Sequence, residues 1–190
     1  MVTMAGLLNI YINAYGVKSI IVIDRLIMDL KPGDILLTKN TDKVGNPTPG
    51  YWNHAAVVGR DNFVIEAQEE VPKLLPEGGI VKSNGYYFWE RYPEILCLRY
   101  GQINISSAAE KYVGNPYRKI ASVFMFMRKP TRGENCVSLI RRAYQDTTGE
   151  DPKWKFPDDI AKDPRLIQVG YKKDYEGWKE PDDWYKGVSI

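Results

Sequence analysis

The sequence has few of the residues that build metal sites and disulfide frameworks. Its 190 residues include two cysteines, Cys97 and Cys136, and one histidine, His54. Two cysteines cannot form a disulfide framework, and with a single histidine they are too few for a zinc site made of Cys and His alone. We therefore expect no metal and no cofactor. Any reaction that needs an imidazole must use His54.

An excess of one charge is also lacking. Lys and Arg total 26 against 24 Asp and Glu, which gives a formal net charge of +2 and a pI near 8.4. A dedicated nucleic-acid binder concentrates basic charge. We therefore expect no nucleic-acid partner, and we interpret basic pairs such as Arg141-Arg142 and Lys172-Lys173 as solvated faces.

Long apolar runs are missing as well. Residues 1–17 carry no charged side chain, but Lys18 ends this stretch before the roughly 18 apolar residues that a membrane helix requires. No basic region precedes it, as a secretory signal peptide would need. We expect no integral membrane segment, and an N-terminal extension, residues 1–30, that packs on the domain. The sequence leaves open the compartment and whether residues 1–28 are retained in the mature protein.

The remaining composition is typical of one soluble globular domain with an ordinary core, at 44% hydrophobic and 26% charged residues. Turn residues and apolar runs predict strands at residues 35–37, 54–58, 63–67 and 95–100. Ser107 and Glu110 match a capping box, which predicts a helix ending at Gly114. An apolar stripe predicts a second helix from about Asn135 to Thr148. We expect residues 151–190 to form an irregular, partly packed extension, and the fold class to be α+β, an antiparallel sheet flanked by helices.

Cys136 and His54 are the first candidate catalytic residues. Cys136 lies in the first turn of the predicted helix, where unpaired amides and the helix dipole favour a thiolate. His54 opens a predicted strand and could serve as its general base. The alternatives are a small buried hydrophobe for Cys136 and a structural histidine for His54. Cys97, inside an apolar run, is expected to be core.

Glu66 is the third candidate, because it interrupts an apolar strand where a carboxylate is costly unless it is paired. A three-residue loop, Arg60 to Asn62, would place Ala56 opposite Glu66. Glu66 would then share a sheet face with His54 and could hold the second imidazole nitrogen. A two-residue loop would put the two side chains on opposite faces. The alternative role is a solvent-facing glutamate.

Five segments in this order resemble the circularly permuted, papain-like NlpC superfamily, and within it the YiiX-like cysteine hydrolases, distant relatives of lecithin–retinol acyltransferase. They are GDIL at 33–36, NHAAVV at 53–58, VIEA at 64–67, YVGNPY at 112–117 and NCVSLI at 135–140. Residues 156–160 together with residues 164–166 also resemble the stretch after the cysteine helix. Val137 departs from the pattern, because a serine frequently follows the cysteine in relatives.

This resemblance implies a permuted papain-like catalytic domain over residues 31–169, with residues 170–190 as a C-terminal extension. It assigns Cys136 as nucleophile, His54 as base and Glu66 as orienting residue of a peptidase-like or amidase-like cysteine hydrolase. Peptide, peptidoglycan or lipid acyl substrates are the partners that it suggests. An acyltransferase or a non-catalytic binding module remains the alternative. Nearby aromatic residues could line a groove, although core packing is the expected role for most of them: Tyr51, Trp52, Tyr86, Tyr87, Phe88 and Trp89.

Overall fold

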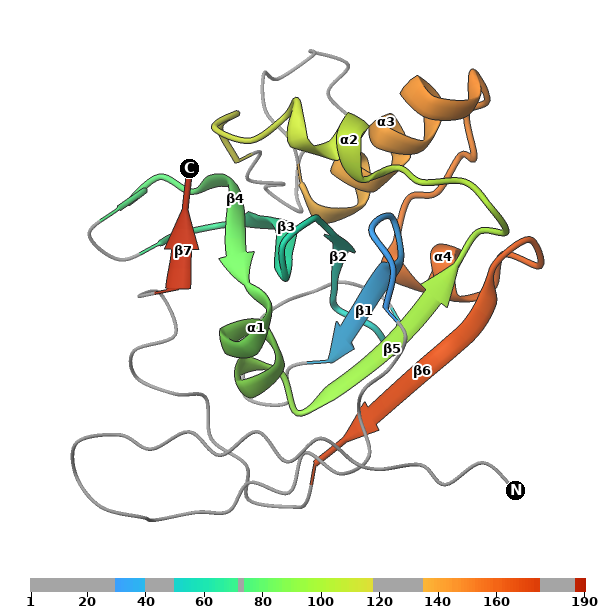
Figure 1. Cartoon of the computed structure of the whole chain (residues 1–190), viewed down its shortest axis with the longest axis horizontal. Coiled ribbons are helices and arrows are strands. Elements are labelled where there is room, and N and C mark those ends of the chain that lie inside the picture. Colours follow the sequence, from blue (N-terminus) through green and yellow to red (C-terminus); the bar gives the residue numbers. More distant parts are fainter. Residues whose placement is uncertain (1–29, 40–49, 72–73, 118–134, 175–186) are drawn as a thin grey trace, which may run out of the picture.

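The computed structural model of this chain describes residues 30–39, 50–71, 74–117, 135–174 and 187–190. Apart from Leu30, the expected N-terminal extension lies outside these residues, so its packing stays a prediction. Within the described ranges, seven strands form one sheet in the order β6-β5-β1-β2-β3-β4-β7, and every neighbouring pair is antiparallel (Figure 1). The strands are β1 (Ile35–Lys39), β2 (His54–Val58), β3 (Phe63–Gln68), β4 (Gly79–Asn84), β5 (Glu94–Arg99), β6 (Ile167–Lys173) and β7 (Val188–Ser189).

Helices cover both faces of this sheet. Successive residues of a strand point to opposite faces, so the apolar side chains on each face need a covering element. The helices are α1 (Gly85–Arg91), α2 (Ser106–Glu110), α3 (Cys136–Thr148) and α4 (Pro157–Ala161). The side chains of α2, α3 and α4 share one core with Leu37, Ala55 and Val57 of the sheet, and we call this side the α3 face. Phe88 of α1 packs with Leu36 and Ala56 on the other side, which we call the α1 face (Figure 1).

The α+β class, the antiparallel sheet, the four expected strands and the helix near residues 135–148 are confirmed. The expected capping box at Ser107 is wrong. Ser107 lies inside α2, whose N-cap residue is Ile105, and Asn104 Oδ1 instead accepts from the backbone N of Ser106 at 2.9 Å. This helix ends at Glu110, and a turn leads from there to Gly114.

The expectation of an irregular tail is also corrected. Residues 151–190 include α4, β6 and β7, and β6 pairs with β5 from Ile167 to Lys173, with a register shift between Cys97 and Leu98. This edge strand, IQVGYKK, is largely exposed, but Ile167, Val169 and Tyr171 alternate with more polar residues, and this strand signal was overlooked in the sequence. Since β6 runs from residue 167 to residue 173, it continues across the expected boundary between residues 169 and 170.

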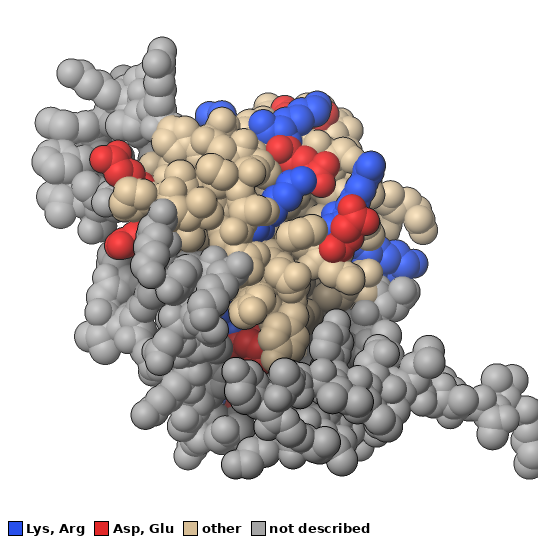
Figure 2. Space-filling model, turned by 60° about the vertical axis from the view of Figure 1, so that its left-hand side comes forward, with Lys and Arg blue, Asp and Glu red and all other residues tan. Residues whose placement is uncertain are grey.

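The basic pairs behave differently from one another. Arg141 forms an ion pair with Asp151 at the surface, as expected of a solvated face. Lys172, by contrast, is 12% exposed, donates to the backbone O of Tyr92 at 2.9 Å and pairs with Asp174 at 2.8 Å, so its assignment to a solvated face is wrong. On the side of the molecule in Figure 2, basic and acidic side chains lie beside one another rather than in a patch of one sign. No helix among the described residues has the length and apolar character needed to cross a membrane.

Candidate functional site

His54 and Glu66 lie together on the α1 face. Ala56 is opposite Glu66 across β2 and β3, and the backbone N of Gly59 donates to the backbone O of Phe63 at 2.8 Å, which confirms the three-residue loop. The imidazole Nε2 of His54 lies 2.9 Å from Oε2 of Glu66. The imidazole is 15% exposed, whereas the carboxylate is completely buried.

Besides His54, the side chains of Arg91, Ser83 and Gln68 form hydrogen bonds with the Glu66 carboxylate. Arg91 Nη2 lies 3.0 Å from Oε2 and Nη1 lies 3.4 Å from Oε1, while Ser83 Oγ and Gln68 Nε2 donate to Oε1 and Oε2. Burial by itself would raise the pKa of Glu66, but the charge of Arg91 and the bonds with His54 and Ser83 outweigh it and lower the pKa to about 2. Glu66 is therefore a carboxylate, and not a carboxylic acid, at neutral pH.

Cys136 is the first residue of α3, and a reciprocal capping box fixes this start. Asn135 Oδ1 accepts from the backbone N of Ser138 at 2.8 Å, and Ser138 Oγ accepts from the backbone N of Asn135 at 2.8 Å. The half-buried Cys136 side chain packs against the core of the α3 face. The thiol in the first turn of this helix lies near the start of β2, where it interacts with His54.

The imidazole of His54 connects the two candidate residues. Burial would lower the pKa of His54, but its side-chain hydrogen bonds with Cys136 and Glu66 outweigh burial, and the pKa is raised. Nε2 is bonded to Glu66, so Nδ1 is the nitrogen available to the thiol. The ring of Tyr92 stacks on the imidazole with centroids 5.6 Å apart and an interplanar angle of 22°. The structure thus brings all three sequence-predicted residues together.

The residues that surround this group were missed in the sequence. Arg91, Tyr92, Ser83 and Gln68 all contact Glu66. The buried arginine follows an aromatic cluster in α1, and no spacing rule connects that position to Glu66. Burial raises the pKa of the Tyr117 phenol, and electrostatic interactions with Cys136 and Glu69 raise it further, so Tyr117 also belongs to the surroundings of the site.

Cys97 lies apart from this group of residues, and possible metal ligands do not cluster within the described ranges. Cys97 is buried on the α1 face, and burial, aided by the charge of Asp34, raises the pKa of its thiol to about 12, so the predicted core role is confirmed. No cluster of three or more His, Cys, Asp or Glu side chains within the described ranges is arranged to hold a metal ion.

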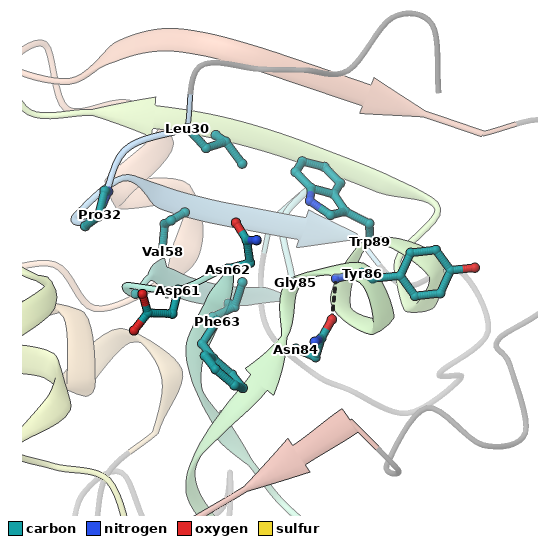
Figure 3. A pocket seen from close by; sticks show the side chains of 12 residues that line it. Leu30, Pro32, Val58, Asp61, Asn62, Phe63, Asn84, Gly85, Tyr86 and Trp89 are labelled. Carbon is teal, nitrogen blue, oxygen red and sulfur yellow. Dashed lines mark hydrogen bonds between the residues drawn. The ribbon is translucent and has the colours of Figure 1, made fainter. Parts of the chain in front are cut away.

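A separate pocket of about 570 Å³ lies around the turn between β2 and β3 and the start of α1 (Figure 3). Asn84 Oδ1 accepts from the backbone N of Tyr86 at 2.9 Å and caps this end of the helix. His54, Glu66 and Cys136 do not line this pocket. Of the aromatic residues expected near a groove, Tyr86 and Trp89 line the pocket, whereas Trp52 and Phe88 are core residues.

Comparisons with known proteins support the fold. No protein-family model matches the chain, and no curated protein sequence matches it. The crystal structure of the metalloprotein YiiX from Escherichia coli O157:H7 matches with a TM-score of 0.53 and 16% identity, over 76% of this chain and 98% of that one. The chain therefore has a YiiX-like α+β fold.

Proposed function

We propose that this protein is a cysteine hydrolase, peptidase-like or amidase-like, that cleaves an amide or ester through an acyl-enzyme on Cys136. One arrangement carries the proposal. His54 is hydrogen-bonded to the ionised Glu66 through Nε2, and its interaction with Cys136, the first residue of α3, helps to raise its pKa. A nucleophile, a base in contact with it and a third group that orients the base are what nucleophilic catalysis requires.

The reaction follows from these contacts. His54 accepts the proton of Cys136 Sγ, and the thiolate attacks the carbonyl carbon of the substrate. The backbone amides of Cys136 and Val137 precede the capped amide of Ser138 and have no acceptor inside the helix, so they are available to stabilise the oxyanion. The imidazolium then donates its proton to the leaving nitrogen or oxygen as the carbon–heteroatom bond breaks. Water, deprotonated by His54, releases the acyl group as a carboxylic acid and restores the thiol.

The permuted papain-like family assignment is part of this proposal. The order of the three residues, with histidine and carboxylate on adjacent strands before the helix that carries the cysteine, supports it, as does the similarity of the fold to YiiX. The substrate class that we propose is an acyl compound of peptide or peptidoglycan type. An amine or alcohol in place of water would make the same acyl-enzyme an acyltransferase.

YiiX is described as a metalloprotein, which raises the question of whether the donor groups of this chain could hold a metal ion. The described residues contain no suitable cluster of three ligands. The carboxylate oxygens of Glu66 already accept from Arg91, Ser83, Gln68 and His54. These residues do not fit a metal ion, and no step of the proposed reaction uses one.

The proposal is tested by trapping the acyl-enzyme. The protein is mixed with a p-nitrophenyl acyl ester, and the mass added to each cysteine is measured by peptide mass spectrometry. We expect one acyl group on Cys136 and loss of p-nitrophenol release in Cys136→Ala, with Cys97→Ala as the matched control that retains release. Equal release by Cys136→Ala would contradict the proposal and favour a non-catalytic module. Peptides, peptidoglycan fragments and lipid esters, each with and without an added amine, then identify the substrate and the acceptor.

A further inference from the structure

We infer that Arg91 is a positioning residue of this site, whose guanidinium holds the buried Glu66 carboxylate in place and shares its charge, and so controls how Glu66 supports His54. The consequence for catalysis rests on the proposed function. The effect on the imidazole does not, because it follows from the contacts alone.

The contacts form a continuous chain through the α1 face. Arg91 and Glu66 are 3% and 0% exposed, and the guanidinium forks over both carboxylate oxygens at 3.0 and 3.4 Å. Oε2, the closer oxygen, is the one that lies 2.9 Å from His54 Nε2. Because one oxygen faces both groups, a displacement of the guanidinium also displaces the acceptor of the imidazole.

The helix α1 places this arginine. Asn84 caps its start, and Phe88, one helical turn before Arg91, is buried in the core of the α1 face. Residues three apart lie on the same side of a helix, so the packing of Phe88 turns Arg91 toward the sheet. Arg91 also donates to the hydroxyl of the next residue, Tyr92, whose ring stacks on His54. Arg91 therefore contacts Tyr92, and Tyr92 contacts His54, beside the carboxylate that Arg91 and His54 share.

The charges explain what Arg91 does. Cys136 from α3, Glu66 from β3 and Tyr92 after α1 face His54, while Arg91, Ser83, Gln68 and Tyr92 face Glu66. With Arg91 present, one negative charge is divided between two cations. Without Arg91, that charge would act on the imidazole alone, which would then hold its proton more tightly. A general base that must also return its proton works best with a pKa near the working pH, so an imidazole that is too basic slows turnover.

The test uses the fact that His54 is the only histidine, so its imidazole signals are unambiguous in NMR. The titration midpoint of His54 is compared in the wild type, Arg91→Met and Arg91→Lys. Arg99→Met is the matched control, since Arg99 makes a similar fork with Asp34, at 2.7 Å to each oxygen, away from His54. We expect the Arg91→Met midpoint to rise by about half a pH unit or more and the Arg99→Met midpoint to stay at the wild-type value.

A midpoint in folded Arg91→Met within about 0.2 pH unit of the wild type, or below it, would overturn the inference. If Arg91→Met does not fold, Arg91→Lys decides, because it keeps the charge but loses the fork. A shifted midpoint in that variant supports the inference and an unshifted one overturns it. Acyl-adduct formation on Cys136 is measured in the same samples. A shifted midpoint without any adduct in the wild type would retain the role of Arg91 and reject the hydrolase.

Discussion

His54 and Glu66 meet diagonally across the ladder between β2 and β3, although they are not register partners. Glu66 is opposite Ala56, and the small alanine side chain leaves room for the carboxylate to reach Nε2 of His54 at 2.9 Å. A larger residue at position 56 would occupy that space. The pairing therefore depends on register, on the three-residue loop and on one small side chain.

The first prediction concerns the two thiols. In the native protein, iodoacetamide should label Cys136 and leave Cys97 unmodified, because Cys97 is fully buried. His54→Ala should slow the labelling of Cys136 at pH 6 by about tenfold or more, since the thiolate loses its imidazolium partner. Peptide mass spectrometry over time measures both rates. Identical rates in the two proteins, with the pH dependence of an ordinary thiol, would disprove the pairing.

The second prediction concerns acid stability. The pKa of Glu66 is lowered from 4.5 to about 2 in the folded protein, so its stabilisation is fully present above pH 4.5 and is lost as the pH falls toward 2. At about 1.4 kcal/mol per pH unit, this is on the order of 3 kcal/mol. Urea unfolding at pH 7, 4 and 3 should therefore show a steep loss in the wild type and a smaller one in Glu66→Gln.

Glu66→Gln should also be less stable than the wild type at pH 7, by about 3–5 kcal/mol, because it leaves Arg91 buried without its carboxylate. Asp151→Asn is the control, since it removes a surface pair with Arg141 and should change stability little. If Glu66→Gln keeps the acid sensitivity of the wild type, another carboxylate is responsible.

The third prediction concerns the start of α3. Asn135→Ala removes the acceptor of the Ser138 backbone N and should lower stability by about 1 kcal/mol. It should also slow the labelling of Cys136, because the first turn of the helix is no longer fixed. Asn104→Ala removes a comparable acceptor at the start of α2 and should lower stability without affecting the thiol. Thermal unfolding and labelling are measured for both, and equal effects on labelling would argue against a local role of the cap.

The fourth prediction concerns the segment that leads into β2. Asp158 Oδ2 accepts from the backbone N of Trp52 at 3.1 Å, two residues before His54. Asp158→Ala should cost about 1 kcal/mol and broaden or shift the NMR signals of His54, because the approach to β2 becomes looser. Asp159→Ala, which removes acceptors for Phe156 and Lys155 instead, should leave those signals unchanged. An unchanged spectrum in both variants would show that Asp158 does not hold His54.

Much of the site could be predicted from the sequence because local rules define it. The three-residue loop sets the register that brings Glu66 to His54, and the apolar stripe places Cys136 at the start of a helix. The capping box that starts α3 was missed because Ser138 takes the place of the usual Glu or Gln. Scarcity also helped, since a single histidine left one choice of base.

The surroundings of Glu66 could not be predicted, because they depend on tertiary packing. Arg91 reaches the carboxylate only after α1 folds back on the sheet, and an arginine in sequence is normally expected at the surface. The strand β6 is a different case, because its alternation of Ile167, Val169 and Tyr171 was present in the sequence and was overlooked. The partner of Lys172 could not be predicted, because its ammonium donates to the carbonyl of Tyr92, 80 residues away in the chain.

The residues of the proposed site come from both faces of the sheet. Cys136 belongs to the α3 face, whereas Glu66 lies on the α1 face with Arg91 beside it, and His54, at the start of β2 on the α1 face, interacts with both. Under the proposed function, substitutions near Cys136 should change which acyl groups react, and substitutions near Arg91 should change the titration of His54. The strand layer separates these two sets of positions, so the proposed function predicts that acyl selectivity and pH dependence can be changed separately, each by substitutions on its own face of the sheet.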